Sequence, residues 1–122
     1  MDIISLASEA LKPISSEGIS VEQGWYDKDA KKMHITLWSL GDYDGAHADD
    51  KPEIDVASVQ VNIWSDRDQI LLKARIKRLM KKAGFYYMGG NDEMETDTKV
   101  FINAMRFMYA QESEEMEEEE NE

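Results

Sequence analysis

The chain has 122 residues, of which 42% are hydrophobic, so it can fill one modest core and we expect a single domain. It contains no cysteine, which excludes disulfides and thiolate metal sites and favours a cytosolic over a secreted setting. Its apolar runs are far shorter than the roughly 18 residues of a membrane span, and its start lacks the positive flank of a signal peptide, so we expect a soluble, untargeted protein.

The net charge of −12 is concentrated at the C-terminus. Eight of the 26 acidic residues lie in positions 112–122, which leaves −4 on residues 1–111. A run of glutamates repels itself and buries no apolar surface, so we divide the chain into an α+β domain over residues 1–109 and a disordered acidic tail over residues 110–122. We interpret the tail as solubilising, with a specific basic partner as the alternative.

The N-terminal part of the chain predicts one helix and two strands. Residues 3–11 repeat apolar side chains at helical spacing before Pro13. Residues 19–25 have the pattern of a strand, and residues 33–38 alternate as a strand with one buried face. Residues 27–31 form the predicted connection, so we expect the two strands to pair as a hairpin.

Residues 40–53 are rich in Gly, Asp and Pro and poor in apolar side chains, which predicts a long loop. Loops of more than about 12 residues are often functional. The loop carboxylates are therefore candidate subunit or partner contacts, namely Asp42, Asp44, Asp49 and Asp50.

A calcium-loop pattern is partly present in the same segment. Asp42, Asp44 and Glu53 occupy its first, third and twelfth places. The pattern fails inside, because its fifth place is Ala46 and its glycine is displaced to Gly45, so we expect no metal site.

A third strand and a second helix follow. Residues 57–64 alternate between an apolar face and a polar, open face. Ile54 and Val56 are apolar at the positions that would belong to the polar face. This change indicates either a bulge near residues 56–57 or a strand that begins between two packed layers. We expect the helix to begin at Ser65 or Asp66 as N-cap and to stop at Gly84. Its apolar stripe, suited to packing on a sheet, consists of Leu72, Ile76, Leu79, Met80 and Ala83.

The same helix holds half of the 14 basic residues of the chain: Arg67, Lys73, Arg75, Lys77, Arg78, Lys81 and Lys82. Lys73, Lys77 and Lys81 are four apart, so we expect them to share the outward face, where like charges repel. They are candidate contacts to an acidic surface of a neighbouring subunit or partner, and a solvated helix face is the alternative. Direct nucleic-acid binding is not expected, because aromatic residues do not interleave with the basic ones and the body of the chain is negative.

The remaining chain predicts a strand at residues 85–88, a turn at residues 89–92 with an acidic connection up to Asp97, and a long last strand at residues 99–109. The element order is α-β-β-β-α-β-β. This order predicts an α+β fold, a small antiparallel or mixed sheet of about five strands with two helices on one face.

The sequence offers little catalytic chemistry. Two histidines, no cysteine and no glycine-rich phosphate loop leave the usual catalytic constellations incomplete. His34 lies on a predicted strand, where a packed or surface histidine is more common than a catalytic one. We therefore expect no enzymatic activity, no cofactor and no metal.

Residues 54–107 also carry a family resemblance. The motifs are short: VQVNIWS at 59–65, Leu79 ahead of Gly84-Phe85, an acidic stretch at 93–97, and a strand that ends with Arg106-Phe107. Through these motifs the segment resembles the tail-completion proteins of long-tailed bacteriophages and prophages. These are tail-terminator or head-tail joining proteins. In element order the resemblance extends over residues 1–109. The sequence departs from the pattern at Asn62, where an aspartate is expected, and in the acidic tail.

The resemblance implies a non-enzymatic structural protein that forms a ring, usually a hexamer, when assembled and can remain monomeric in isolation. Such a ring caps the tail tube and joins it to the head, with tail-tube and head-completion proteins as partners. Its place would be the tail or neck of the virion, and the host cytoplasm during assembly. The resemblance also implies that Trp64 and Phe85 determine the fold and that Arg106 lies near a subunit contact.

The acidic tail and the carboxylates of residues 42–50 motivate a second hypothesis, an acidic regulatory or nucleic-acid-mimic binding protein. A mimic needs carboxylates at fixed spacing on rigid elements. Most of these carboxylates lie in segments that the sequence predicts to be mobile, which favours the first hypothesis.

Overall fold

The structure, a computed structural model, describes residues 1–24, 32–48 and 51–113, with the backbone alone for residues 46–48 and 51–53. The predicted connection at residues 27–31, the candidate contacts Asp49 and Asp50, and residues 114–122 of the predicted tail lie outside the described residues.

Within the described residues the chain forms three helices and five strands: α1 (Ile3–Ala10), α2 (Lys12–Ser15), β1 (Val21–Gln23), β2 (His34–Ala48), β3 (Lys51–Ser65), α3 (Ile70–Lys82), β4 (Tyr86–Glu95) and β5 (Val100–Glu112). The strands build one mixed sheet in the order β1-β2-β3-β5-β4. The predicted α+β class and strand number are confirmed. The helix count is higher than expected, because Pro13 stands in the first turn of the separate helix α2, where a missing N–H costs nothing.

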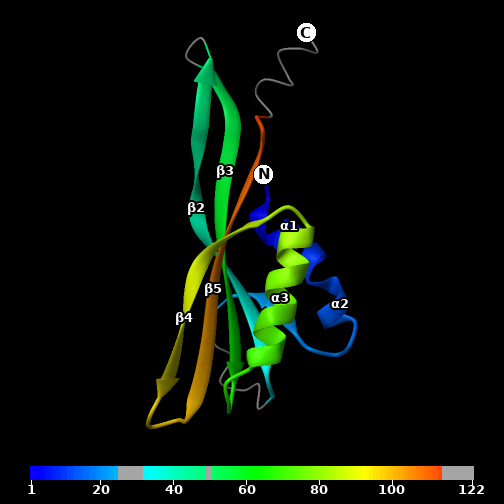
Figure 1. The fold of residues 1–122 in the computed structure, drawn as a ribbon, viewed down its shortest axis with the longest axis vertical. Coiled ribbons are helices and arrows are strands. Elements are labelled where there is room, and N and C mark those ends of the chain that lie inside the picture. The colour runs from blue at the N-terminus through cyan, green and yellow to red at the C-terminus, as the bar shows by residue number, and fades with distance from the viewer. Residues whose placement is uncertain (25–31, 49–50, 114–122) are drawn as a thin grey trace.

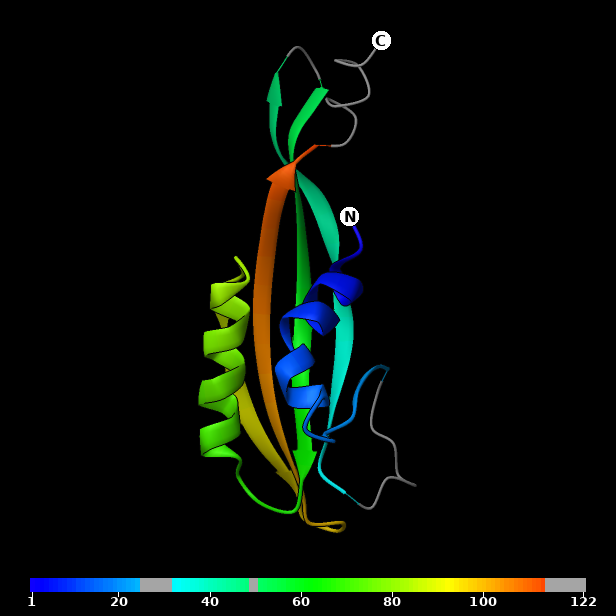
Figure 2. The same ribbon diagram turned by 90° about the vertical axis from the view of Figure 1, so that its right-hand side faces the viewer.

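All three helices lie on one face of the sheet, as Figures 1 and 2 show from two directions. Alternate strand residues point to this face and pack against the apolar sides of the helices in one core. The core consists mainly of Ile35, Leu37, Val59, Val61, Ile63, Met105 and Phe107 of the sheet and Ile3, Ala7, Leu11, Ile14, Ile76 and Met80 of the helical segments. We call the opposite face the open face, because no described helix lies on it. The placement of the helices on one face is therefore confirmed.

Strand β1 is parallel to β2, so the predicted hairpin of the first two strands is wrong. Val21 stands opposite Ile35, and the backbone N–H of Ile35 donates to the carbonyl oxygen of Ser20 at 2.8 Å. Parallel neighbours need a longer connection than a hairpin turn, and ten residues separate Gln23 from His34. Apolar alternation is the same for both strand directions, so it could not distinguish them.

The predicted loop at residues 40–53 is also wrong, because its described residues, 40–48 and 51–53, extend β2 and β3 into a long antiparallel pair whose far end projects beyond β5 (Figure 2). We call these two paired strands the hairpin. Two bulges on β2, at Leu40 and Gly45, absorb residues that do not fit the pairing. Ile54 is the last residue of β3 that pairs with β5 toward the far end of the hairpin. Pro52 lies past this point, so β5 requires no hydrogen bond from the N–H that proline lacks. We call the part of this hairpin beyond Trp38 the arm.

The bulge near residues 56–57, one of the two interpretations of the changed parity, is absent. From Ile54 to Ser65, β3 pairs with β5 without a register shift. The register shifts of β3 occur in its pairing with β2. Val56 therefore points to the open face, and Ala57 points to the core.

The predicted turn at residues 89–92 is wrong, because strand β4 continues through Gly89 and Gly90 to Glu95. The chain turns later, between Glu95 and Val100. Gly90 is required by packing, because an added Cβ would lie 2.2 Å from the carbonyl oxygen of Ala104 on β5. Gly89 has φ +104 at a bulge that follows Tyr87. Gly90 thus serves a close strand pairing and Gly89 serves the bulge, and neither reverses the chain.

Helix α3 begins later than predicted. Ser65 and Asp66 do not cap it, since the Ser65 hydroxyl donates to the carbonyl of Arg67 and the N-cap residue is Gln69. The C-terminal stop is confirmed, because Gly84 has φ +100. β5 continues to Glu112, three residues past the expected domain boundary at residue 109.

Candidate interaction surfaces

Lys73, the first of the three candidate lysines, is half-buried and forms an ion pair with a carboxylate of the same chain. Its ammonium donates to both carboxylate oxygens of Asp92 on β4, each at 2.9 Å. The hydrogen bond from Lys73 lowers the pKa of Asp92, with a second contribution from Asn103, and the same bond raises the pKa of Lys73. Lys73 therefore joins α3 to the edge of the sheet and is not an outward charge.

Lys77 and Arg75 are also engaged within the chain. The Lys77 ammonium lies 4.1 Å from the centre of the Tyr87 ring, a cation–π contact. The Arg75 guanidinium donates two hydrogen bonds to Glu17, at 2.6 and 2.7 Å, and so ties α3 to the segment after α2. The prediction that Lys73 and Lys77 share the outward face with Lys81 is wrong, since both lean toward β4.

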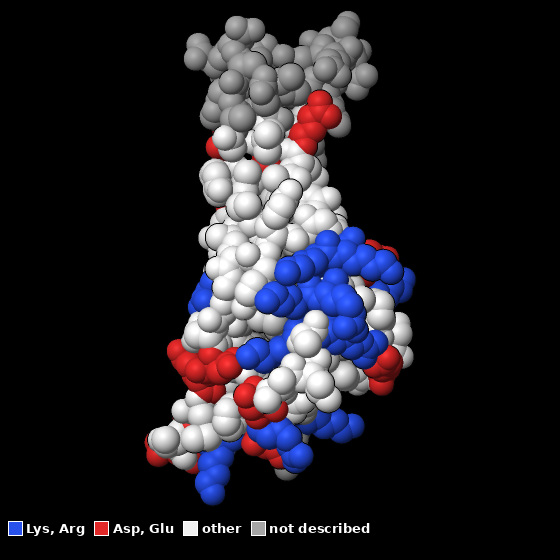
Figure 3. All heavy atoms as spheres, in the orientation of Figure 1, with Lys and Arg blue, Asp and Glu red and all other residues white. Residues whose placement is uncertain are grey.

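The outward side of α3 carries a different set of residues. Arg78, Lys81 and Lys82 are exposed, and none of the three forms a hydrogen bond or ion pair with another described residue. Figure 3 shows the basic side chains gathered over α3. We call Arg78, Lys81 and Lys82 the basic surface of α3. Leu71, which is 87% exposed, lies on the same side nearer the start of the helix.

The open face carries an apolar patch that the sequence reasoning missed. Tyr43, Tyr86 and Met88 are 59%, 63% and 55% exposed. The Tyr43 hydroxyl donates to the sulfur of Met108 at 3.8 Å, and the Ser58 hydroxyl donates to the sulfur of Met88 at 3.9 Å. We call Tyr43, Tyr86, Met88 and Met108 the open-face patch. In the sequence, Tyr86 and Met88 alternate with Phe85 and Tyr87, which are buried and half-buried in the structure. This alternation is the signal that could have predicted an apolar patch on the open face.

Arg106, the candidate contact from the resemblance, lies on the open face beside this patch. It stands opposite Gln60 on β3 and Gly89 on β4, and its guanidinium donates to the side-chain oxygen of Asn91 at 2.9 Å. Arg106 is therefore a half-buried cation in the middle of the open face.

A buried polar cluster occupies the other half of the open face, where the sequence predicted exposed polar residues. Thr36, Asn62 and Trp64 are buried, and the Trp64 indole N–H donates to the Thr36 hydroxyl at 2.8 Å. Gln60 donates to the Asn62 side chain at 2.7 Å, and His34 stacks on Trp64 with ring centres 6.3 Å apart. His34 is packed, which is one of the two roles expected for it, and Trp64 and Phe85 are buried.

The arm brings three carboxylates together. Asp44 pairs in register with Asp55, and Asp42 is two residues away on the same strand face. With Met1, Tyr43 and Val56 they line a hollow of about 170 Å³. Among the described residues no group of three or more His, Asp or Glu side chains is arranged to hold a metal ion.

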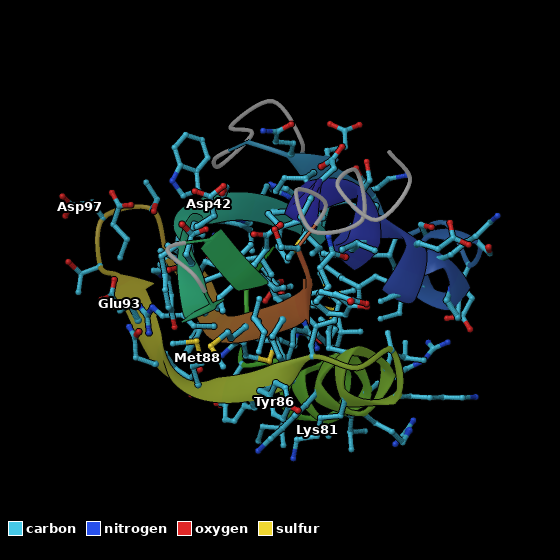
Figure 4. All side chains as sticks on the ribbon, turned by 90° about the horizontal axis from the view of Figure 1, so that it is seen from above. Asp42, Lys81, Tyr86, Met88, Glu93 and Asp97 are labelled. Atoms are coloured by element: carbon cyan, nitrogen blue, oxygen red, sulfur yellow. The ribbon has the colours of Figure 1, made fainter. Side chains whose placement is uncertain are left out.

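Figure 4 looks down the long axis, and in this view Tyr86 lies near Lys81 at the α3 end of β4. Met88, Glu93 and Asp97 lie on the side of the sheet away from the helices, and Lys81 lies with α3. Glu93 points to the open face, since it pairs in register with Ile102. The molecule thus presents a basic helix on one side and a partly apolar, partly acidic sheet face on the other.

No protein-family model and no curated protein matches the sequence. In the described part of the chain, none of the helices combines the length and the apolar character of a membrane span.

Proposed function

We propose that this chain is a non-enzymatic structural protein of a phage or prophage particle, which forms an oligomeric ring that caps the tail tube and joins it to the head. The observation that supports the proposal is the pair of unlike surfaces on opposite sides of one sheet. Contacts between unlike surfaces are head-to-tail contacts, and these generate closed rings when the rotation between subunits closes.

The open-face patch supplies one half of such a contact. Large contiguous apolar patches on a protein surface mark interaction sites, and three members of the open-face patch are more than half exposed. Further along β4, toward its C-terminal end, Glu93 and Glu95 give that face a negative rim.

The outward side of α3 supplies the other half. Leu71 offers apolar area, and Arg78, Lys81 and Lys82 offer positive charge that matches the negative rim of the open face. Complementary rim charges steer assembly more than they hold it, so the apolar contact would contribute most of the stability. The motif resemblance over residues 54–107 points in the same direction.

The test uses purified protein and tail tubes that lack their terminator. Negative-stain electron microscopy should show ring density at one tube end, and joining to filled heads should follow. Arg78→Glu with Lys81→Glu should abolish end binding, whereas Lys12→Glu with Lys32→Glu, a matched reversal away from α3, should leave it intact. Bare tube ends with the wild-type protein would overturn the proposal.

A second candidate, an acidic regulatory or nucleic-acid-mimic binding protein, gains support from the arm. Asp42, Asp44 and Asp55 stand on paired strands and not in a loop, so their spacing is more fixed than the sequence suggested. Gene position separates the two candidates. A place among portal, capsid and tail-tube genes favours tail completion, and an isolated early gene favours the regulator.

A further inference from the structure

The basic surface of α3 lacks an acidic partner within the described residues. Most other cations of the helix are neutralised locally, Lys73 by Asp92 and Arg75 by Glu17. Arg78, Lys81 and Lys82 stand together in the last turns of α3, exposed and unpaired with any described residue. Three neighbouring cations without counter-charges form a site for an anionic segment.

The chain itself carries such a segment. Residues 114–122 read Glu-Glu-Met-Glu-Glu-Glu-Glu-Asn-Glu, so seven of the nine are acidic. They follow Ser113, which is only 1% exposed and fixes the point from which the segment departs.

The distance along the fold allows the segment to reach the basic surface of its own chain. The Phe85 ring, just after α3, lies 5.0 Å from the Tyr109 ring on β5, so the end of the helix is beside Tyr109. Ser113 is then about 13 Å further along β5, at roughly 3.3 Å per residue. Arg78 lies about 10 Å back along the helix, at roughly 1.5 Å per residue. Nine extended residues span about 30 Å, which exceeds the sum of the two distances.

We propose that the acidic segment 114–122 docks on the basic surface of α3 in the same chain and competes there with acidic partners. Each exposed ion pair contributes little, but a tethered segment is present at an effective concentration of about millimolar, far above that of a second copy at micromolar protein. The attraction weakens with salt, because the Debye length falls from about 10 Å at 0.1 M to about 3 Å at 1 M. The segment then acts as a built-in competitor that a partner with a larger contact area displaces.

The direct test compares the full chain with a chain that ends at Ser113, by NMR of backbone amides at low salt. Amides of residues 78–83 should shift between the two proteins, the shifts should be independent of protein concentration, and they should vanish at about 1 M salt. A full-length variant with all seven glutamates of the segment changed to glutamine should resemble the shortened chain. Unchanged amides over α3 would overturn the proposal, and shifts that grow with protein concentration would do so as well, since they would place the segment on a second copy.

The competitive role has its own readout, with a synthetic peptide of residues 112–122 as probe. The shortened chain should bind the peptide about twofold more tightly than the full chain at low salt, because a tethered competitor at about millimolar effective concentration occupies half of the basic surface when its own dissociation constant is about millimolar. Arg78→Gln, Lys81→Gln and Lys82→Gln together should remove this difference, whereas the charge-matched triple Lys12→Gln, Lys32→Gln and Lys99→Gln should preserve it. Equal peptide affinity of the full and shortened chains would overturn the competition. These experiments use the isolated protein, so a failure of tube capping would leave their result unchanged.

Discussion

The side-chain oxygen of Asn103 on β5 accepts the backbone N–H of Gln69 at 3.1 Å and so caps α3 across 34 residues of sequence. Its amide nitrogen donates to Asp92 at 2.7 Å and to Asp68 at 3.0 Å. Asn103 is completely buried, and its three bonds join the start of the helix to two strands of the sheet. A residue outside the helix thus performs the capping that Ser65 or Asp66 was expected to perform.

Asn103→Ala should lower the free energy of unfolding by about 2 kcal/mol, because it leaves buried donors and acceptors without partners. Asn91→Ala is the matched control, since Asn91 makes its bonds to Arg106 and Glu93 on the surface. The control should cost less than about 0.5 kcal/mol. Urea unfolding of both variants measures the difference, and equal costs would show that Asn103 is not the anchor of the helix.

The bond between Lys73 and Asp92 predicts a pH dependence of stability. The pKa of Asp92 is lowered in the folded protein, so its contribution is present above the unfolded value of about 3.9 and is lost as the pH falls through the folded pKa. The pKa of Lys73 is raised, so its contribution is present below about 10.4 and is lost as the pH rises through the folded pKa.

Asp92→Asn should therefore destabilise the protein at pH 7 by roughly 1 kcal/mol, a modest value because the Asp92 side chain is 40% exposed and solvent screens the pair. The difference from the wild type should shrink toward pH 2 and again above about pH 10.5. Asp97→Asn, in the adjacent turn, is the charge-matched control. A difference that stays constant from pH 2 to pH 7 would contradict the assignment to this ion pair.

The sequence was sufficient for the elements whose pattern reports burial directly. The spacing of Ile76 and Met80 identified the core side of α3, and the alternation of Val59, Val61 and Ile63 identified the core side of β3. These side chains face one continuous apolar layer, so local periodicity and tertiary packing agree. The α+β order followed from the same signals.

The sequence was insufficient where long-range pairing overrides local chemistry. Gly89, Gly90 and Pro52 are turn-forming residues by local preference, but each lies within a strand because a bulge, a close approach or an unpaired edge accepts it. The outward side of α3 was misjudged for a related reason. Lys73 and Lys77 lean toward Asp92 and Tyr87, whose positions depend on the course of β4.

Gly90 offers a test of the close approach between β4 and β5. In Gly90→Ala the new Cβ would lie 2.2 Å from the backbone oxygen of Ala104, and because the obstacle is backbone, the strands must separate. We expect a loss of about 2 to 3 kcal/mol in unfolding free energy. In Gly18→Ala the Cβ meets nothing within 4 Å, but φ is +97, so that variant reports backbone strain alone, of about 1 kcal/mol. A smaller cost for Gly90→Ala than for Gly18→Ala would contradict the steric argument.

The bond between Trp64 and Thr36 tests whether the buried cluster on the open face is a specific polar network. Trp64→Phe keeps most of the ring that stacks on His34 but removes the indole N–H, and Thr36→Val removes the acceptor at 2.8 Å with little change in shape. If the two side chains depend on each other, the double variant should cost less than the sum of the single variants, with a coupling of about 1 kcal/mol. Urea unfolding of the four proteins gives this coupling.

Gln60→Ala paired with Trp64→Phe is the control, since Gln60 donates to Asn62 and not to Trp64. The coupling between these two substitutions should be clearly smaller. Costs for Trp64→Phe and Thr36→Val that add within about 0.3 kcal/mol would show that the cluster is held by packing and not by its hydrogen bonds.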